Sequence, residues 1–311
     1  MPSLQVKMLG EFRVRFENET WQWRESCKAR ELFCYLMIHR APRHQREHLA
    51  ETLWCDSPKA TAMKNLRQTL WQLQRKYASQ QKGTPRHLFC TDSEWLSLHP
   101  DLEVWTDVRE FEKAAECLRG PSELDDARAR ILQQAVPLYQ GDLLEGWYQD
   151  WCLYERERLQ NLYLMILGKL IVYCEKHQQY EAGIGYGERV LKYDFAGERT
   201  HQRMMSLKHL SGDRTGALRQ YERCVKALRD EFGVQPGRRT RELYEEIRSD
   251  RMAPHDPSPS VTPSCGAACQ LSPADLLSQL RGFQATLAEL QQQAQQWVQV
   301  VEEFDSGQPK D

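Results

Sequence analysis

The chain has 311 residues and a mass of 36.5 kDa, a length typical of two or three domains rather than one minimal module. Hydrophobic residues make up 41% and charged residues 28%, which excludes a wholly disordered or collagen-like chain. The mean hydropathy is -0.71, and no run of about 18 apolar residues occurs, so no membrane span is expected. The N-terminal residues lack a basic-then-apolar signal pattern, which predicts a cytoplasmic protein.

The charge is unevenly distributed along the chain. The net charge of -2 argues on its own against a nucleic-acid binder. Residues 24–86, however, hold 13 basic against 5 acidic side chains, whereas residues 251–311 hold 3 against 7. A local excess of this size is typical of a surface that meets a phosphate backbone. We therefore look for a nucleic-acid contact in the first third of the chain.

Alternating apolar residues predict a small antiparallel sheet at the start of the chain. Leu4, Val6 and Met8 alternate with polar residues, and the alternation resumes after Gly10 through Phe16. Strands this short need a helical partner to be stable. We therefore expect the helices that follow to pack on this sheet.

Three helices and a hairpin are predicted next. Apolar periodicity places the helices over about 28–40, 45–54 and 60–78 and the strands of the hairpin over 88–91 and 95–98. The apolar residues of the third helix fall within a stripe roughly 80° wide. This order of elements is typical of a winged helix, whose third helix enters the major groove while the hairpin contacts the DNA backbone or the minor groove.

The third predicted helix carries donors and cations opposite its apolar stripe. The residues expected to contact base edges are Lys64, Arg67, Gln68, Trp71 and Arg75. Those expected to contact phosphates are Arg43, His44, Arg46, Thr61, Arg86 and His87. The alternative is a solvated face of an ordinary amphipathic helix, but the order of elements, the charge excess and the geometry of the face together favour double-stranded DNA.

The rest of the chain is predicted to be helical. Over about 111–250, short breaks separate helices, and Glu188–Lys192 matches Glu222–Lys226 at an offset of 34 residues, the period of tetratricopeptide helix pairs. Residues 251–273 are rich in Pro, Ser and Ala and are expected to be a flexible linker. A heptad pattern over 274–305 then predicts a coiled coil and a homodimer. The predicted dimerisation residues are Leu276, Leu280, Phe283, Leu287, Leu290, Trp297, Val301 and Phe304.

Several short segments resemble a known family. The opening Leu4–Gly10, the segments Leu53-Trp54 and Pro58-Lys59-Ala60, and Leu70–Arg75 are similar to its winged helix. The segments Trp105–Phe111, Leu138–Leu144, Glu155–Leu159 and Phe232–Gly237 are similar to its junction and helical domain. The family is that of the Streptomyces antibiotic regulatory proteins, which join an OmpR-type winged helix to a bacterial transcriptional activator domain built from tetratricopeptide-like repeats.

This resemblance implies the organisation and the partners of the chain. It implies a mainly helical fold with a small β component, with a winged helix over 1–110 and an activator domain over 111–250. It also implies an activator that recruits RNA polymerase at promoters of biosynthetic gene clusters and binds direct-repeat sites. In such proteins the loop between the second and third helices is expected to contact polymerase, here through Trp54, Asp56 and Lys59.

Two other classes of function compete with this interpretation. One is a repeat-based interaction scaffold or ligand sensor that uses its winged helix for protein contact. The other is a zinc hydrolase, because His44, Glu47 and His48 spell H-x-x-E-H. No third ligand is evident, and no phosphate-binding glycine loop or nucleophile elbow occurs. We therefore expect no metal, no cofactor and no enzymatic activity.

Overall fold

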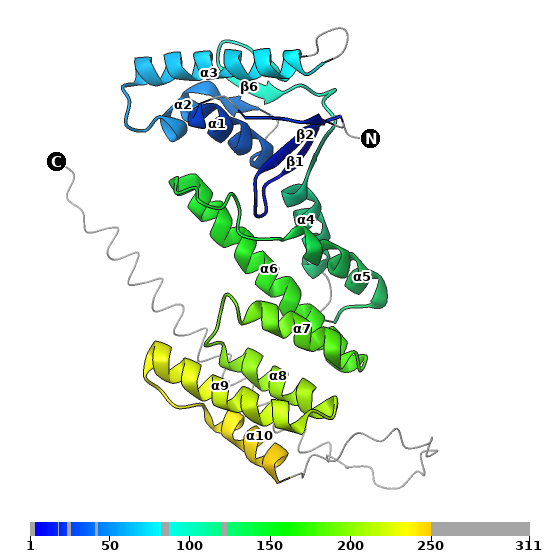
Figure 1. The fold of residues 1–311 in the computed structure, drawn as a ribbon. Helices are drawn as coiled ribbons and strands as arrows, with labels where there is room; N and C mark the ends of the chain where they lie inside the picture. Colours follow the sequence, from blue (N-terminus) through cyan, green and yellow to red (C-terminus); the bar gives the residue numbers. More distant parts are fainter. Residues whose placement is uncertain are drawn as a thin grey trace, which may run out of the picture. The chain divides into compact units, whose positions relative to one another are not determined.

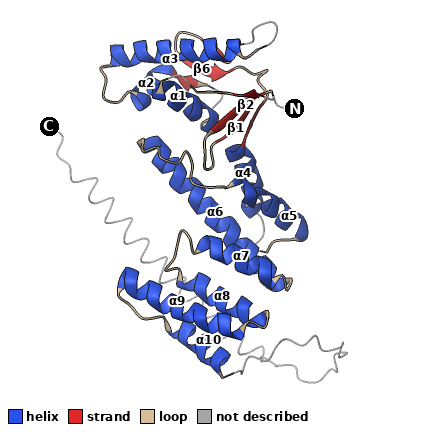
Figure 2. Cartoon of the chain, viewed as in Figure 1, coloured by secondary structure: helices blue, strands red, loops and turns tan. Residues whose placement is uncertain are grey.

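The computed structural model describes residues 4–17, 19–23, 26–40, 43–81, 87–119 and 123–249. Within them the fold is mainly helical, with two small sheets near the N-terminus (Figures 1 and 2). Arg86, the linker over 251–273 and the predicted coiled coil over 274–305 lie outside the described residues. None of the described helices is both long enough and apolar enough to cross a lipid bilayer.

A four-stranded sheet begins the fold, in the order β3-β2-β1-β7. Its strands are β1 (Leu4–Lys7), β2 (Arg13–Phe16), β3 (Glu19–Thr20) and β7 (Val104–Thr106). The first three are antiparallel, and the alternate residues Leu4, Val6 and Val14 are buried, as the alternation predicted. The strand β7 runs parallel to β1 and pairs Thr106 with Val6, an arrangement that the sequence pattern did not predict.

Three helices and a second sheet complete the winged helix. The helices are α1 (Cys27–Ile38), α2 (Arg46–Leu53) and α3 (Lys59–Ser79). The second sheet has the order β4-β6-β5 and consists of β4 (His44–Gln45), β5 (Phe89–Thr91) and β6 (Trp95–Leu98). The helix α1 begins where the Ser26 hydroxyl accepts a hydrogen bond from the backbone N–H of Ala29, a typical N-cap. The predicted helices agree with the observed ones to within two residues at each end.

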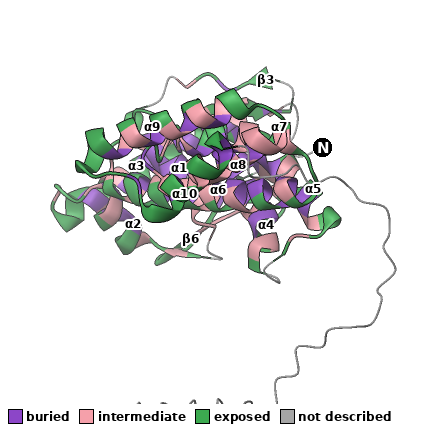
Figure 3. Ribbon diagram, turned by 90° about the horizontal axis from the view of Figure 1, so that it is seen from below, coloured by how far each residue is buried: buried purple, intermediate pink, exposed green. Residues whose placement is uncertain are grey.

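The remaining described residues form a stack of helices. They are α4 (Asp107–Ala115), η1 (Glu116–Arg119), α5 (Asp126–Ala135), η2 (Val136–Leu138), α6 (Asp150–Lys176), α7 (Tyr180–Val190), α8 (Glu198–Leu210), α9 (Arg214–Phe232) and α10 (Arg238–Arg248). The helices α7 and α9 start 34 residues apart, and each is followed by a partner helix, α8 and α10 respectively, which gives tetratricopeptide-like pairs. Buried and exposed residues alternate around these helices (Figure 3).

Glycine permits the close approach of α7 and α8. A Cβ at Gly187 would lie 2.1 Å from the Met204 sulfur, and one at Gly183 would lie 3.0 Å from a methyl carbon of Leu207. Alanine replaces Gly183 in the second repeat, where Ala217 is fully buried. Gly183, Gly187 and Ala217 therefore lie where helices contact one another.

Buried polar contacts join the first sheet to the helical domain. Asp107, the first residue of α4, is buried, and its carboxylate accepts hydrogen bonds from the backbone N–H groups of Met8 at 2.8 Å and Leu9 at 2.9 Å. Burial raises the pKa of Asp107, although these bonds oppose the shift. Leu9 also forms a β-bridge with Leu143, and Gly10, at φ +96°, donates to a carbonyl of the same segment.

Candidate nucleic-acid interface and helical-domain groove

The five predicted base-contact residues share one exposed face of α3. Lys64, Arg67, Gln68, Trp71 and Arg75 are all exposed, and at 3.6 residues per turn they span roughly 100° of the helix surface. The indole of Trp71 is 60% exposed, which is unusual for so large an apolar ring. The Arg75 guanidinium lies 5.3 Å from the centre of that ring, within the range of a cation–π contact. Trp71 therefore supports Arg75 in an orientation that faces away from the core.

The opposite face of α3 explains why these side chains remain outside. Leu66, Leu70 and Leu73 are buried in the same core as Phe16 and Leu96, which come from the two sheets. Since this buried stripe fixes the rotation of the helix about its axis, the polar residues on the opposite side face solvent. The sequence pattern alone was sufficient to predict this feature.

The predicted phosphate contacts divide into two groups. Arg43, Thr61 and His87 are exposed, whereas Arg86 lies outside the described residues. His44 is half-buried in β4, and burial lowers its pKa, which disfavours the charged form that a phosphate contact would use.

Arg46 has a task within the wing. Its Nη1 donates to the backbone carbonyl of Asp92 at 2.7 Å, in the turn between β5 and β6. The Asp92 carboxylate in turn accepts hydrogen bonds from the N–H groups of Glu94 at 2.9 Å and Trp95 at 2.6 Å, which lowers the pKa of Asp92. Arg46 therefore holds the tip of the hairpin, a role that its position in the sequence did not reveal.

The predicted polymerase-contact loop lies between α2 and α3. Trp54 is half-buried at the C-terminus of α2, and Asp56 is exposed at the turn. Lys59, the first residue of α3, forms an exposed ion pair of 2.8 Å with Glu47. This loop is thus an ordered turn with one acidic and one basic side chain at its surface.

The H-x-x-E-H motif does not have the geometry of a zinc helix. His44 belongs to β4, while His48 lies in α2, so the two histidines are not successive turns of one helix. Glu47 is engaged with Lys59. Within the part of the chain that the structure describes, no group of three His, Cys, Asp or Glu residues is placed to hold a metal ion.

A groove in the helical domain was not predicted from the sequence. It has a volume of about 590 Å³ and is lined by α6 and α8 together with the segment before α5. Its apolar floor includes Met165 and Val172, which are 58% and 42% exposed. The cations Lys169, Arg199 and Arg203 also line it. The sequence carried one indication of this groove: Met165 and Val172 are apolar, lie two turns apart and fall outside the buried stripe of α6.

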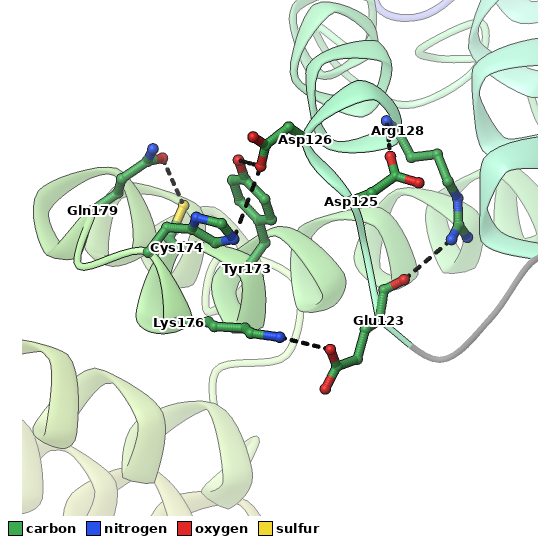
Figure 4. Close-up of polar contacts among 9 residues, drawn as sticks. Glu123, Asp125, Asp126, Arg128, Tyr173, Cys174, Lys176 and Gln179 are labelled. Atoms are coloured by element: carbon green, nitrogen blue, oxygen red, sulfur yellow. Dashed lines mark hydrogen bonds and ion pairs between the residues drawn. The ribbon is translucent and has the colours of Figure 1, made fainter. Parts of the chain in front are cut away.

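Polar contacts join the C-terminal part of α6 to Glu123 and to the first turn of α5, beside residues that line the groove (Figure 4). Lys176 of α6 forms an ion pair of 2.6 Å with Glu123, and the Tyr173 hydroxyl donates to the Asp126 carboxylate at 2.9 Å. On the facing side, Arg203 Nη1 donates to the carbonyl of Gly168 at 3.2 Å. These bonds hold charged groups at the rim and leave the floor apolar.

The architecture defined by these features is a winged helix followed by tetratricopeptide-like helices. Residues 106–248 match the bacterial transcriptional activator domain. The chain is 28% identical to the regulatory protein DnrI of Streptomyces peucetius over 264 residues, which cover 78% of this chain and 92% of that protein. It also resembles the structure of Mycobacterium tuberculosis EmbR, solved with a low-affinity phosphopeptide, with a TM-score of 0.56 and 19% identity, over 80% of this chain and 66% of that one.

The matches to the activator domain and to DnrI agree with the motifs found in the sequence. Residues 106–248 are thus a bacterial transcriptional activator domain, and the similarity to DnrI supports the resemblance to the Streptomyces antibiotic regulatory proteins. The likeness to EmbR concerns the fold alone, because the identity is low and this chain spans only 66% of the EmbR chain.

Proposed function

We propose that this protein binds duplex DNA through α3 and its wing and activates transcription by recruiting RNA polymerase at promoters of biosynthetic gene clusters. The observation that carries the proposal is the exposed face of α3, where Arg75 is supported by the ring of Trp71. Arginine and lysine at such positions contact guanine, and glutamine, here Gln68, contacts adenine. Arg43, Thr61 and His87 are proposed to contact phosphates, while Arg46 positions the wing.

Selection of bound DNA from a random pool tests the DNA-binding half of this proposal. An enriched sequence is expected, with affinity that falls as salt rises, at a slope of about -0.9 per phosphate contacted. Enrichment of two copies of one motif in the same orientation would support binding to direct repeats. Failure to enrich any sequence would contradict the proposal.

Transcription with purified polymerase tests the activating half. A promoter carrying the selected site is expected to be stimulated by the protein. The variant Asp56→Ala is expected to lose stimulation while it keeps its affinity for the site, because Asp56 is exposed in the α2–α3 loop and lies outside the predicted DNA-contact residues. Stimulation that persists in this variant would remove the loop from the mechanism.

We also propose that the segment over 274–305 pairs with a second copy of the chain. Linking two DNA-binding modules strengthens binding to paired sites by roughly 10² to 10⁴ without new base contacts. Truncation after residue 250 is expected to lower the mass measured by light scattering and to weaken binding to paired sites more than to single ones. Equal masses with and without the segment would contradict this proposal.

The groove favours a second function, docking of a partner, which the scaffold interpretation also requires. Its proposed occupant is an amphipathic helix with acidic side chains, because an apolar floor at Met165 and Val172 lies beside Arg199 and Arg203. Burial, and then the neighbouring Arg199, lower the pKa of Arg203, so an added carboxylate would stabilise its charge.

A synthetic helix with leucines on one face and glutamates beside them tests the groove. This acidic helix is expected to bind the wild-type protein but not the Met165→Glu variant. A second helix, in which lysines replace the glutamates, is expected not to bind the wild-type protein. Equal binding of both peptides would contradict the proposed occupant. If DNA selection also failed, binding of the acidic helix would favour the scaffold interpretation.

A further inference from the structure

A buried carboxylate connects the helical domain to the winged helix. Glu31 lies in α1, and its side chain is only 4% exposed. One of its oxygens accepts a hydrogen bond from the indole N–H of Trp151, in the first turn of α6, at 3.2 Å. The other lies 2.9 Å from Lys28 Nζ. A buried carboxylate is strongly destabilising unless it is paired and hydrogen-bonded, so Glu31 depends on a partner from each domain.

Lys28 extends this contact to the end of α2. Its ammonium also donates to the backbone carbonyl of Leu53, the last residue of α2, and lies 5.9 Å from the centre of the Trp54 ring. The last carbonyls of a helix have no partner within the helix, and a cation at that end complements the helix dipole. Lys28 therefore stabilises the point at which α2 ends and the α2–α3 loop begins.

The other end of the α2–α3 loop is held more weakly. The ion pair between Lys59 and Glu47 is exposed on both sides, and exposed pairs contribute little to stability. Inside the loop, the N–H of Ser57 donates to the carbonyl of Trp54 at 3.0 Å. Of the two ends of the loop, the one held by Lys28 is connected to the buried Glu31, and through Glu31 to Trp151 of the helical domain.

Ring packing fixes the indole of Trp151. Its ring meets Tyr35 of α1 edge to face, with ring centres 5.3 Å apart and an interplanar angle of 79°. The same turn of α6 carries the buried Glu155, which pairs with Arg158 at 2.7 Å. Trp151 is thus oriented by residues of α1, and its N–H has a defined direction toward Glu31.

We infer that Trp151, Glu31 and Lys28 form an interdomain chain of contacts by which the helical domain sets the conformation of the α2–α3 loop. Removing the indole N–H leaves one buried oxygen of Glu31 without its donor. The carboxylate then turns toward water or toward Lys28, and either movement loosens the bond from Lys28 to the Leu53 carbonyl. These are positioning residues, and their importance for activation rests on the proposed role of the loop in contacting polymerase.

Hydrogen exchange on the full-length protein tests the inference directly. Trp151→Phe keeps the aromatic packing and removes only the N–H donor, and Glu31→Gln keeps the shape and removes the charge that binds Lys28. Exchange of the backbone amides of residues 54–57 is expected to be roughly fivefold faster in either variant, the effect of losing one hydrogen bond. The buried part of α3 is expected to exchange as in the wild type. Trp147→Phe, whose ring contacts Arg30 and Phe12 rather than Glu31, is the matched control.

A double-mutant cycle separates a chain of contacts from independent effects. Lys28→Met, at a side chain 44% exposed, perturbs the other end and supplies a second variant if Trp151→Phe folds poorly. The combination with Trp151→Phe is expected to accelerate exchange no more than either change alone. Unchanged exchange in both single variants, or effects that multiply in the double variant, would overturn the inference.

Transcription measured on the same variants addresses the function of the loop. Trp151→Phe is expected to keep wild-type affinity for the selected DNA site and to lose several-fold of the stimulation. If the loop amides exchange faster and stimulation is unchanged, the contact chain stands and the proposed polymerase contact fails. The two ideas are therefore refuted by different measurements.

Discussion

Replacing both Arg67 and Arg75 by alanine removes two guanidinium groups from the exposed face of α3 and leaves its buried stripe intact. The two residues are eight positions apart, or roughly 12 Å along the helix, which is beyond the distance at which mutational effects usually interact. Each bidentate contact of arginine with a base contributes about 1–3 kcal/mol to discrimination. The sum is about 2–6 kcal/mol, a loss of roughly 30-fold to 20,000-fold in affinity.

Titration of the selected DNA site at several salt concentrations measures this loss. If the arginines contact bases, the variant is expected to bind selected and scrambled DNA with nearly equal affinity. If they contact phosphates instead, affinity falls for both sequences, and the salt slope decreases by about 0.9 for each lost contact. Because Trp71 already supports Arg75, less side-chain freedom is lost on binding, and we expect the larger share of the effect at Arg75.

Arg219→Ala with Arg229→Ala is the matched control, since both residues are exposed on α9 and the change in net charge is the same. It is expected to leave the affinity within about twofold of the wild type, with only a general effect of charge. Wild-type affinity and an unchanged salt slope in the Arg67 and Arg75 variant, shown by circular dichroism to be folded, would refute the assignment of α3 as the recognition helix.

Two further predictions concern stability. Gly183→Ala places a Cβ 3.0 Å from Leu207 and is expected to be about 1–3 kcal/mol less stable than Gly185→Ala, the same change at a site with open space around it; equal melting temperatures would contradict the packing argument. Burial lowers the pKa of His201 below its ordinary value near 6.5, so the unfolded state binds more protons there and stability falls as the pH drops through that value. His201→Gln is expected to flatten the loss of melting temperature between about pH 7.5 and 5.5, and parallel curves for the two proteins would exclude this histidine as the cause.

The features that could be predicted from the sequence are those with a repeated pattern. The stripe that includes Leu66, Leu70 and Leu73 recurs every three or four residues over about four turns, so it predicted both the existence of α3 and its rotation. Because the rotation was known, the exposure of Lys64 and Arg75 followed from it. The 34-residue offset predicted the helix pairs for the same reason, since many positions carry the signal.

The features that were missed depend on tertiary partners. The strands β4 and β7 have two and three residues, too few to show any alternation, and each exists only because a distant strand pairs with it. His44 was predicted at the start of a helix and is found in β4, where burial suppresses its charge. Its burial follows from the pairing with β6, which no local pattern encodes.

The apolar pattern of the sequence also did not predict which charged residues lie in the core. Glu31 and Asp107 are charged, and sequence reasoning assigns such residues to the surface, yet both are almost completely buried. Each is acceptable there because it accepts hydrogen bonds from another part of the chain: Trp151 for Glu31, and the backbone of Met8 and Leu9 for Asp107. The partners that make the burial possible cannot be read before the fold is known.

The same buried groups restrict how the winged helix and the helical domain can move against each other. Asp107 binds the backbone that follows β1, Leu9 pairs with Leu143, and Glu31 joins α1 to α6, so the attachments come from three different elements. Two domains can rotate about a hinge axis only where few contacts between them lie away from that axis. Attachments spread over separate elements leave no such axis. We therefore expect the face of α3 and the groove beside Met165 to keep a fixed relation when the protein binds DNA. A partner held in the groove would then be placed at a defined distance from the bound site.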